Sequence, residues 1–161
     1  MEIAIISDTH LPRGSRALAA GCVERLKAAD LIVHAGDLSA LEVLDQLQTL
    51  NEVVAVHGNV DDADVRAVLP ESAVIDVAGH RIAIVHDAGP AAGRLRRLRT
   101  RFPRAEAVIF GHSHIPRHER APDGFQIFNP GSPTDRRRQV HHTMGICDVR
   151  PELEFRLVEL D

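Results

Sequence analysis

Near its start the chain reads Ile3-Ala4-Ile5-Ile6-Ser7-Asp8-Thr9-His10, four apolar residues followed at once by four polar ones. Such an apolar run is typical of a short buried strand, and it would deliver the polar groups at the end of that strand. The arrangement recurs at Leu31-Ile32-Val33, which His34-Ala35-Gly36-Asp37 follows. It recurs again at Val53 to Val56, which runs into His57-Gly58-Asn59.

Amphipathic segments separate these three expected strands. We expect one helix from Ser15 to about Ala29, and a second from Ser39, as its N-cap, to about Leu50. Strands and helices then alternate as β-α-β-α-β, which predicts a mostly parallel sheet with helices on its faces.

After Asp61 the pattern changes. Ala78-Gly79 separates two short apolar runs and predicts a hairpin turn. A helix is expected from Pro90 to Arg101, and a buried strand at 107–110. Further strands are expected at 116–120, 125–128, 143–149 and 153–160. Two packed sheets with helices outside would account for this order, and we expect residues 1–161 to form a single domain of the α/β class.

The composition excludes several classes of protein. The 161 residues are 44% apolar and 26% charged with a net charge of −4, as in soluble globular proteins. The absence of Trp and Tyr argues against a stacking platform for single-stranded nucleic acid, and no strongly basic face is evident. No apolar segment approaches the ~20 residues of a membrane span. Cys22 and Cys147 are isolated, which fits buried thiols in a reducing compartment, so we expect a cytoplasmic protein.

Five short blocks place metal-binding side chains where the expected strands end. They contribute two aspartates, one asparagine and four histidines: Asp8, His10, Asp37, Asn59, His86, His112 and His114. Ligand sites in open α/β sheets form beyond the C-terminal ends of the strands, so one crevice can receive all seven. The set is large enough for two divalent cations, and Asp37, with two carboxylate oxygens, is the natural bridge between them. We therefore expect a metal-dependent hydrolase.

Charge counting favours phosphate chemistry at such a centre. Two divalent ions bring four positive charges, and two aspartates with a bridging hydroxide remove three, which leaves about +1. This charge attracts a phosphate anion, and cations about 3.5–4 Å apart suit in-line attack on phosphorus by the bridging hydroxide. Imidazole and carboxylate ligands suit Mn²⁺, Fe²⁺, Co²⁺, Ni²⁺ or Zn²⁺ rather than Mg²⁺ or Ca²⁺. We take Mn²⁺ as the expected metal.

In chain order the motifs are DxH at 8–10, GD at 36–37, GN at 58–59, the lone His86 and GHxH at 111–114. This pattern resembles the calcineurin-like metallophosphoesterases, and among them the small bacterial and archaeal phosphodiesterases. The resemblance covers nearly the whole chain and implies a four-layer α/β/β/α sandwich. It also implies two metals, the first held by Asp8, His10, Asp37 and His114 and the second by Asp37, Asn59, His86 and His112.

The same resemblance implies further roles. Among the seven side chains, we expect Asp37, Asn59 and His112 to take part in catalysis. The run Asn129-Pro130-Gly131-Ser132 matches a late motif of the small family members, which packs near the site. Arg136-Arg137-Arg138 follows it, and either clamps a phosphate oxygen or belongs to a solvated loop, the interpretation that we prefer.

The chain departs from the family pattern at Val60. Many larger members carry histidine after GN, where it assists the transition state or the leaving group; small members often carry cysteine. General acid catalysis contributes roughly 10²–10⁴-fold where it operates, so esters with good leaving groups should be preferred here. Asp61, His34 and His57 are candidate substitutes for the missing proton donor. Asp87 stands where the family usually has glycine after the lone histidine.

We expect a phosphodiesterase that acts on a small phosphate ester. The alternatives are a non-catalytic protein-binding scaffold on the same fold, and a phosphomonoesterase or nuclease. The related scaffold subunit of retromer has lost several of these ligands, whereas this chain has lost none. The sequence is compatible with either a monomer or a homo-oligomer. His80 is expected to be solvent-exposed in the hairpin turn, and His34 either orients a metal ligand or is a core histidine.

Overall fold

The apolar runs pair into two five-stranded sheets in the computed structural model, which describes residues 1–161. The first sheet has the strand order β10-β9-β1-β2-β3. Its parallel part consists of β1 (Glu2–Ile6), β2 (Leu31–His34) and β3 (Val53–Ala55). The antiparallel pair of β9 (Thr143–Val149) and β10 (Leu153–Glu159) completes it, with β9 antiparallel to β1.

The second sheet has the order β4-β5-β6-β8-β7. At its centre β5 (His80–Val85), β6 (Ala107–Ile109) and β8 (Gln126–Asn129) run parallel, flanked by β4 (Ser72–Val77) and β7 (Arg117–Arg120), which are antiparallel to their neighbours. The expected hairpin is confirmed as β4 and β5. Ala78 and Gly79 both have positive φ, at 48° and 86°, as a two-residue type I′ turn requires.

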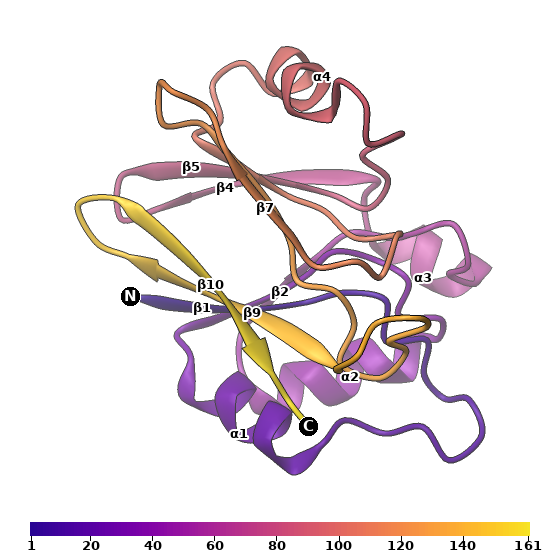
Figure 1. The fold of residues 1–161 in the computed structure, drawn as a ribbon. Helices are drawn as coiled ribbons and strands as arrows, with labels where there is room; N and C mark the ends of the chain where they lie inside the picture. The colour runs from indigo at the N-terminus through magenta and orange to yellow at the C-terminus, as the bar shows by residue number, and fades with distance from the viewer.

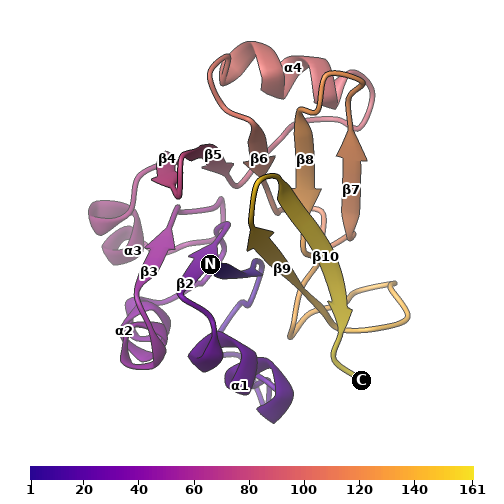
Figure 2. The same cartoon turned by 90° about the vertical axis from the view of Figure 1, so that its left-hand side faces the viewer.

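The helices lie outside the two sheets (Figures 1 and 2). α1 (Ala20–Ala28) and α2 (Leu41–Leu50) cover the first sheet, and α4 (Arg94–Arg101) covers the second. The short α3 (Ala63–Val68) follows β3 and contributes Val65 to the core beneath α1 and α2.

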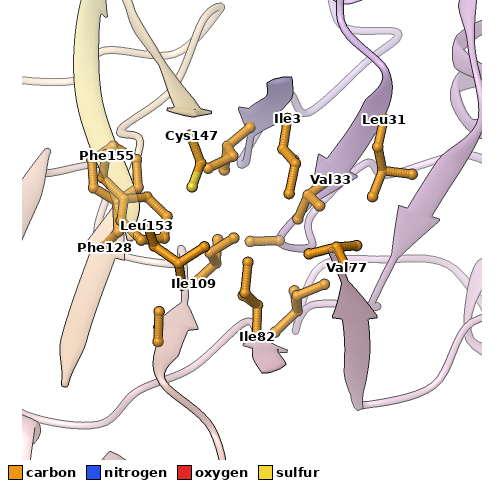
Figure 3. Packing of buried hydrophobic residues seen from close by; sticks show 14 of the residues in the cluster. Ile3, Leu31, Val33, Val77, Ile82, Ile109, Phe128, Cys147, Leu153 and Phe155 are labelled. Carbon is orange, nitrogen blue, oxygen red and sulfur yellow. The ribbon is translucent and has the colours of Figure 1, made fainter. Parts of the chain in front are cut away.

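Three hydrophobic clusters separate the four layers. Because successive residues of a strand point to opposite faces, Ile3 and Ile5 enter the cluster between the sheets while Ala4 and Ile6 face the helices. Figure 3 shows Ile3 of β1 opposite Ile82 of β5 in the first of these clusters. The third cluster packs the second sheet against α4. The expected four-layer α/β/β/α sandwich is therefore confirmed.

The expectation of a mostly parallel sheet holds only for part of each sheet. In the first sheet, two of the four strand pairings are antiparallel. The reason is connectivity: β9 and β10 are joined by a short turn, and two strands joined in this way can only run antiparallel.

Three helix starts differ from the expected ones. α1 begins at Ala20 rather than Ser15, after an irregular segment in which Gly14 has φ +58°. α2 begins at Leu41, with Ala40 as N-cap. Ser39 cannot cap it, because Ser39 has φ +90° and its N–H donates to Asp61 Oδ1. α4 begins at Arg94, since Gly93 before it has φ +69°.

Two further details were not anticipated. α3 is six residues long, too short for a periodic apolar pattern, although Asp62 caps it by accepting from the Val65 N–H at 3.0 Å. The expectation that His80 is solvent-exposed in the turn was wrong. His80 lies in β5, its side chain is 14% exposed, and its ring nitrogens contact Glu106 Oε2 at 2.9 Å and the Arg150 carbonyl at 3.0 Å.

Candidate metal centre

The loops that follow β1, β2, β3, β5 and β6 meet at one edge of the sandwich. Main-chain hydrogen bonds join them: Asp8 N–H donates to the Gly36 carbonyl at 2.9 Å, and Gly111 N–H donates to the His86 carbonyl at 3.0 Å. The His86 ring after β5 also contacts the carbonyl of Ala35, which follows β2 in the other sheet. The convergence at strand ends that the sequence suggested therefore exists in the folded chain.

The structure brings all seven expected ligands together, in two groups. Ligand atoms of Asp8, His10 and His114 lie within 4.8 Å of one another, and so do those of Asp37, His86 and His112. Asn59 belongs with the second group, because its Oδ1 lies 3.2 Å from His86 Nε2 and 3.0 Å from His112 Nδ1.

Asp37 stands between the two groups. Its Oδ2 lies 3.2 Å from His86 Nε2 in its own group, and 3.7 Å from His10 Nε2 in the other. Its Oδ1 accepts the Val60 N–H at 3.0 Å, which fixes the carboxylate plane. One oxygen is thus anchored to the β3 loop, and the other faces both clusters of imidazoles.

Outer hydrogen bonds orient the imidazole rings. His86 Nδ1 lies 2.7 Å from the Ala35 carbonyl, and His114 Nδ1 contacts the Asp135 carbonyl. A carbonyl only accepts, so each Nδ1 carries the proton and each Nε2 presents a lone pair to the site. His10 Nε2 and His114 Nε2 are 3.2 Å apart, a separation that needs a proton or a cation between them.

The backbone of these loops is strained. Five of the seven expected ligands have positive φ: Asp8, His10, Asp37, His112 and His114, at values from 47° to 71°. Non-glycine residues rarely adopt this region, and such conformations cost of order 1–3 kcal/mol each. The conformations persist because the loops hydrogen-bond one another, and their concentration at one place marks a functional site.

At Gly58 and Gly111, neighbouring side chains lie so close that there is no room for a Cβ atom. A Cβ atom on Gly58 would lie 2.0 Å from Asp37 Oδ1, and one on Gly111 would lie 2.0 Å from Ser7 Oγ and 2.8 Å from Asp8 Oδ2. No real Cβ tolerates such distances. The glycines of the GN and GHxH motifs are therefore needed to let two carboxylates lie directly against the neighbouring loops.

One carboxylate oxygen of Asp8 has no hydrogen-bond partner and could bind a cation. Its Oδ2 accepts from Ser7 Oγ at 2.7 Å and from the His112 N–H at 3.0 Å, but its Oδ1 is buried without any hydrogen-bond partner. Burial, only partly offset by the positive charge available at His86, raises the pKa of Asp8 to about 6. An orphaned buried carboxylate oxygen 3.4 Å from His114 Nε2 fits a divalent cation at this position.

In the second group, His86 and Asp37 shift each other's pKa. Burial alone would lower the pKa of His86, but the hydrogen bond to Asp37 and the charges of Asp8 and Asp37 outweigh it and raise the pKa. Burial would likewise raise the pKa of Asp37, but its contact with His86 lowers it. In contrast, burial lowers the pKa of both His10 and His114, which keeps those rings neutral and able to bind a metal.

Asp61 supports the site from behind. This carboxylate is 5% exposed and accepts three main-chain N–H groups: Asp37 at 3.0 Å, Gly58 at 2.6 Å and Ser39 at 2.7 Å. It therefore ties the β2 loop to the β3 loop. Because both oxygens face main chain, Asp61 does not point toward a leaving group, and its expected role as a substitute proton donor was wrong.

His34 is a buried positioning group rather than an acid. Its Nδ1 accepts the Gly36 N–H at 3.1 Å and its Nε2 lies 3.0 Å from Thr9 Oγ1, so it connects the loops after β1 and β2. Burial lowers the pKa of His34 to about 3, which keeps the ring neutral. It does not contact the seven ligands through hydrogen bonds, and it cannot serve as a proton donor at neutral pH.

The late Asn129-Pro130-Gly131-Ser132 motif packs against the site, as expected. Asn129 Nδ2 donates to the Gly111 carbonyl at 2.9 Å, and Ser132 Oγ donates to the Asp8 carbonyl at 2.8 Å. Sequence reasoning missed two neighbours of this motif. Thr134 Oγ1 donates to the Thr9 carbonyl at 2.6 Å, and the Asp135 carbonyl receives the His114 ring proton. In the sequence, only their position just after the motif could have indicated that Thr134 and Asp135 support the site.

The arginines after this motif lie on the surface. Arg136, Arg137 and Arg138 are exposed, and the charge of Arg137 acts on the nearby His114, so both interpretations of this loop stay predictions. Val60, which follows Asn59, is 48% exposed at the rim of the site. None of the four helices combines the length and the hydropathy that a membrane span would need.

Comparisons with known proteins agree with this geometry. Residues 1–152 match the family model described as the calcineurin-like phosphoesterase superfamily domain. A probable metallophosphoesterase of Methanocaldococcus jannaschii is 33% identical over 164 residues, spanning 100% of this chain and 82% of the relative.

Solved structures share the fold. Vps29 of Entamoeba histolytica, solved with zinc, has a TM-score of 0.79 and 21% identity, with 99% of each chain covered. The structure of a novel archaeal phosphodiesterase has a TM-score of 0.76 and 23% identity, covering 99% of this chain and 100% of that one. At these identities the likeness shows the fold alone. The family model and the archaeal relative go further: the chain belongs to the calcineurin-like phosphoesterase superfamily.

Proposed function

We propose that the protein is a phosphodiesterase that uses two divalent transition-metal ions, with Mn²⁺ as the expected metal. The observation that carries this proposal is the unpartnered, buried Oδ1 of Asp8 beside the converging imidazoles. A folded protein rarely leaves such an oxygen unsatisfied without a ligand for it. The metallophosphoesterase family, to which the chain belongs, supports the same chemistry.

The proposed division of ligands follows the two groups of side chains. Asp8, His10 and His114 would hold the first ion, Asn59, His86 and His112 the second, and Asp37 both. Bound ions would supply positive charge at the phosphate and lower the pKa of an attacking water. We propose that Asp37 takes part in catalysis as the ligand that both ions share, and Asn59 and His112 as ligands that position the second ion at the phosphate.

A diester fits the site better than a monoester. Two divalent ions, two aspartates and one hydroxide leave about +1, which matches the single negative charge of a phosphodiester. Neither residue after Asn59 offers a proton, because Val60 is aliphatic and both oxygens of Asp61 accept main-chain N–H groups; His57, which lies in the same cavity as Asn59, is the candidate that is left. We expect hydrolysis to favour a leaving group that departs readily without protonation, such as an aryloxide.

A chromogenic assay tests this function. The protein would be stripped with a chelator, reloaded with Mn²⁺ and given bis(p-nitrophenyl) phosphate. We expect activity only after reloading, and a loss of at least about 100-fold in kcat for Asp37→Asn, which removes the shared anionic ligand. Hydrolysis by the Asp37→Asn variant at the parent rate would refute the bridging role.

A second candidate is a non-catalytic scaffold on the same fold. The likeness to Vps29 of Entamoeba histolytica supports it at the level of fold. The complete set of expected ligands argues against a scaffold. A protein that only binds partners does not need strained loops that bring seven such side chains together. Absence of hydrolysis by a chain that binds two Mn²⁺ would favour the scaffold.

A further inference from the structure

A cavity of about 320 Å³ opens beside the second group of ligands. The expected ligands Asn59 and His86 belong to its lining, together with His57, Arg66, Val85 and Asp87. Its size is at the lower end of the range for small-molecule sites. Because two expected metal ligands line it, an ester group attached to the reacting phosphate could extend into it.

Arg66 of α3 presents a fixed set of hydrogen-bond donors to this cavity. Its Nη2 donates to the Asn59 carbonyl at 2.7 Å, and its Nε donates to the Asp61 carbonyl at 2.9 Å. It forms no ion pair. A guanidinium carries five N–H donors, so three remain for a ligand, on a side chain that the two main-chain bonds already hold in place.

Asp87 presents a fixed acceptor to the same cavity. Its Oδ1 accepts the Gly89 N–H at 2.7 Å, which leaves the other carboxylate oxygen free, and it forms no ion pair. Glu71, the other acidic residue of the lining, is 3.5 Å from Arg101 and is paired there. The cavity therefore offers one unpaired cation and one unpaired anion.

This lining excludes several kinds of ester group. A second phosphate would be repelled by Asp87, and a lipid or aryl group would find only Val85 as an apolar wall. No Phe lines the cavity and the chain has no Trp or Tyr, so a base would find only the smaller imidazole rings of His57 and His86 to stack on. A hydroxyl both donates and accepts, and so matches a carboxylate and a guanidinium together.

We propose that this cavity binds a hydroxylated ester group, of the glycerol or ribose type, on the phosphodiester that the metal centre hydrolyses. Asp87 accepts from one hydroxyl and Arg66 donates to the same or a neighbouring one. A carboxylate accepts a hydrogen bond from a ribose hydroxyl in the same way in dinucleotide-binding folds. The inference rests on the proposed function and adds the substrate class to it.

Two synthetic diesters with the same leaving group test the inference. The Mn²⁺-loaded protein would be given 2,3-dihydroxypropyl p-nitrophenyl phosphate and propyl p-nitrophenyl phosphate, which differ only in the two hydroxyls. We expect the parent to favour the dihydroxypropyl ester by about tenfold in kcat/KM, the effect of one hydrogen bond to a charged group. Asp87→Ala and Arg66→Met should each reduce this ratio to near one.

Using a ratio cancels any change in overall activity that these variants cause. Asp45→Ala, which removes an exposed carboxylate of α2, is the matched control and should keep the parent ratio. A parent ratio near one, or an unchanged ratio in Asp87→Ala, would overturn the inference while leaving the proposed function intact. If the loaded parent cleaves neither ester, the proposed function fails, and the substrate class fails with it.

Discussion

His112 is exposed, as is Asn59, and it belongs to only one of the two groups of expected ligands. His112→Ala should therefore impair the second metal while the first, held by Asp8, His10 and His114, remains. Elemental analysis of the Mn²⁺-loaded and desalted variant should find close to one metal per chain, against two in the parent. His141→Ala, at a partly exposed histidine that lies 3.8 Å from Glu159 of the C-terminal strand, should retain two. Two metals per chain in His112→Ala would contradict the assignment.

A substitution at Asp61 tests whether this residue positions the expected metal ligands. Asp61→Asn keeps the shape but replaces one acceptor oxygen by an amide donor, which faces main-chain N–H groups of the Asp37 and Gly58 loops. Asp37 and Asn59 should then lose their alignment, so Mn²⁺ affinity should fall by at least about tenfold, in line with the effect of removing groups that orient ligands. Titration calorimetry measures this directly.

Asp62→Ala is the control for a merely structural effect. Asp62 is the next residue and caps α3. Its loss should lower the free energy of unfolding by about 1 kcal/mol without changing Mn²⁺ affinity. If both variants lost stability but neither lost affinity, Asp61 would have no role in positioning the ligands.

Protonation of Asp8 and His86 should make metal binding depend on pH. Burial raises the pKa of Asp8 to about 6, and the pKa of His86 is also raised, because its carboxylate neighbours outweigh burial. Both groups must lose their protons to bind a metal, so affinity should fall as the pH drops from 7.5 to 5.5. Calorimetry in two buffers of different ionisation enthalpy should find more protons released per Mn²⁺ at pH 6 than at pH 7.5. Equal release would show that neither group binds the metal.

The strands of this protein are largely predictable from the sequence, because each is a buried apolar run that ends in polar residues. Ile3 to Ile6 and Leu31 to Val33 show this pattern, and both were placed correctly. The helix starts were not: Ser39 and Gly93 adopt positive φ and delay the first turns of α2 and α4, and α1 begins at Ala20 rather than at Ser15. Local conformations of this kind depend on contacts with distant loops, which a single sequence does not display.

The expected ligands could be predicted because their motifs stand at strand ends, whereas the residues that hold them could not. Asp61 and Thr134 act through main-chain N–H and carbonyl groups of other loops. A side chain that binds main chain needs no particular partner residue, so it leaves no motif. Asp61 was singled out for the wrong reason, as a proton donor.

The two sheets pack so closely at Gly145 that a methyl group would not fit in place of its hydrogen atom. A Cβ atom on Gly145 of β9 would lie 2.3 Å from Phe128 Cε1 of β8 in the opposite sheet. Gly145→Ala should therefore force the sheets apart and lower the free energy of unfolding by about 1–3 kcal/mol, as overpacking does. Denaturant unfolding of the metal-free protein measures it. Gly21→Ala in α1, where the nearest atom is the flexible Arg25 Nη1 at 3.3 Å, is the control and should not destabilise.

The four-layer sandwich supports the loops that meet at one edge of the molecule. Three buried clusters hold the four layers together, and none of them includes any of the seven expected ligands. The strain of five residues with positive φ is therefore borne by the loops, while the sandwich supplies the stability. This separation lets substitutions at the ligands change metal binding with little effect on the fold.

Anomalous X-ray diffraction from a crystal soaked in Mn²⁺ would examine the metal centre most directly. The proposed function predicts two anomalous peaks about 3.5–4 Å apart on either side of Asp37, each within bonding distance of its own group of ligands. A single peak, or none near Asp8 and Asp37, would contradict the two-metal phosphoesterase.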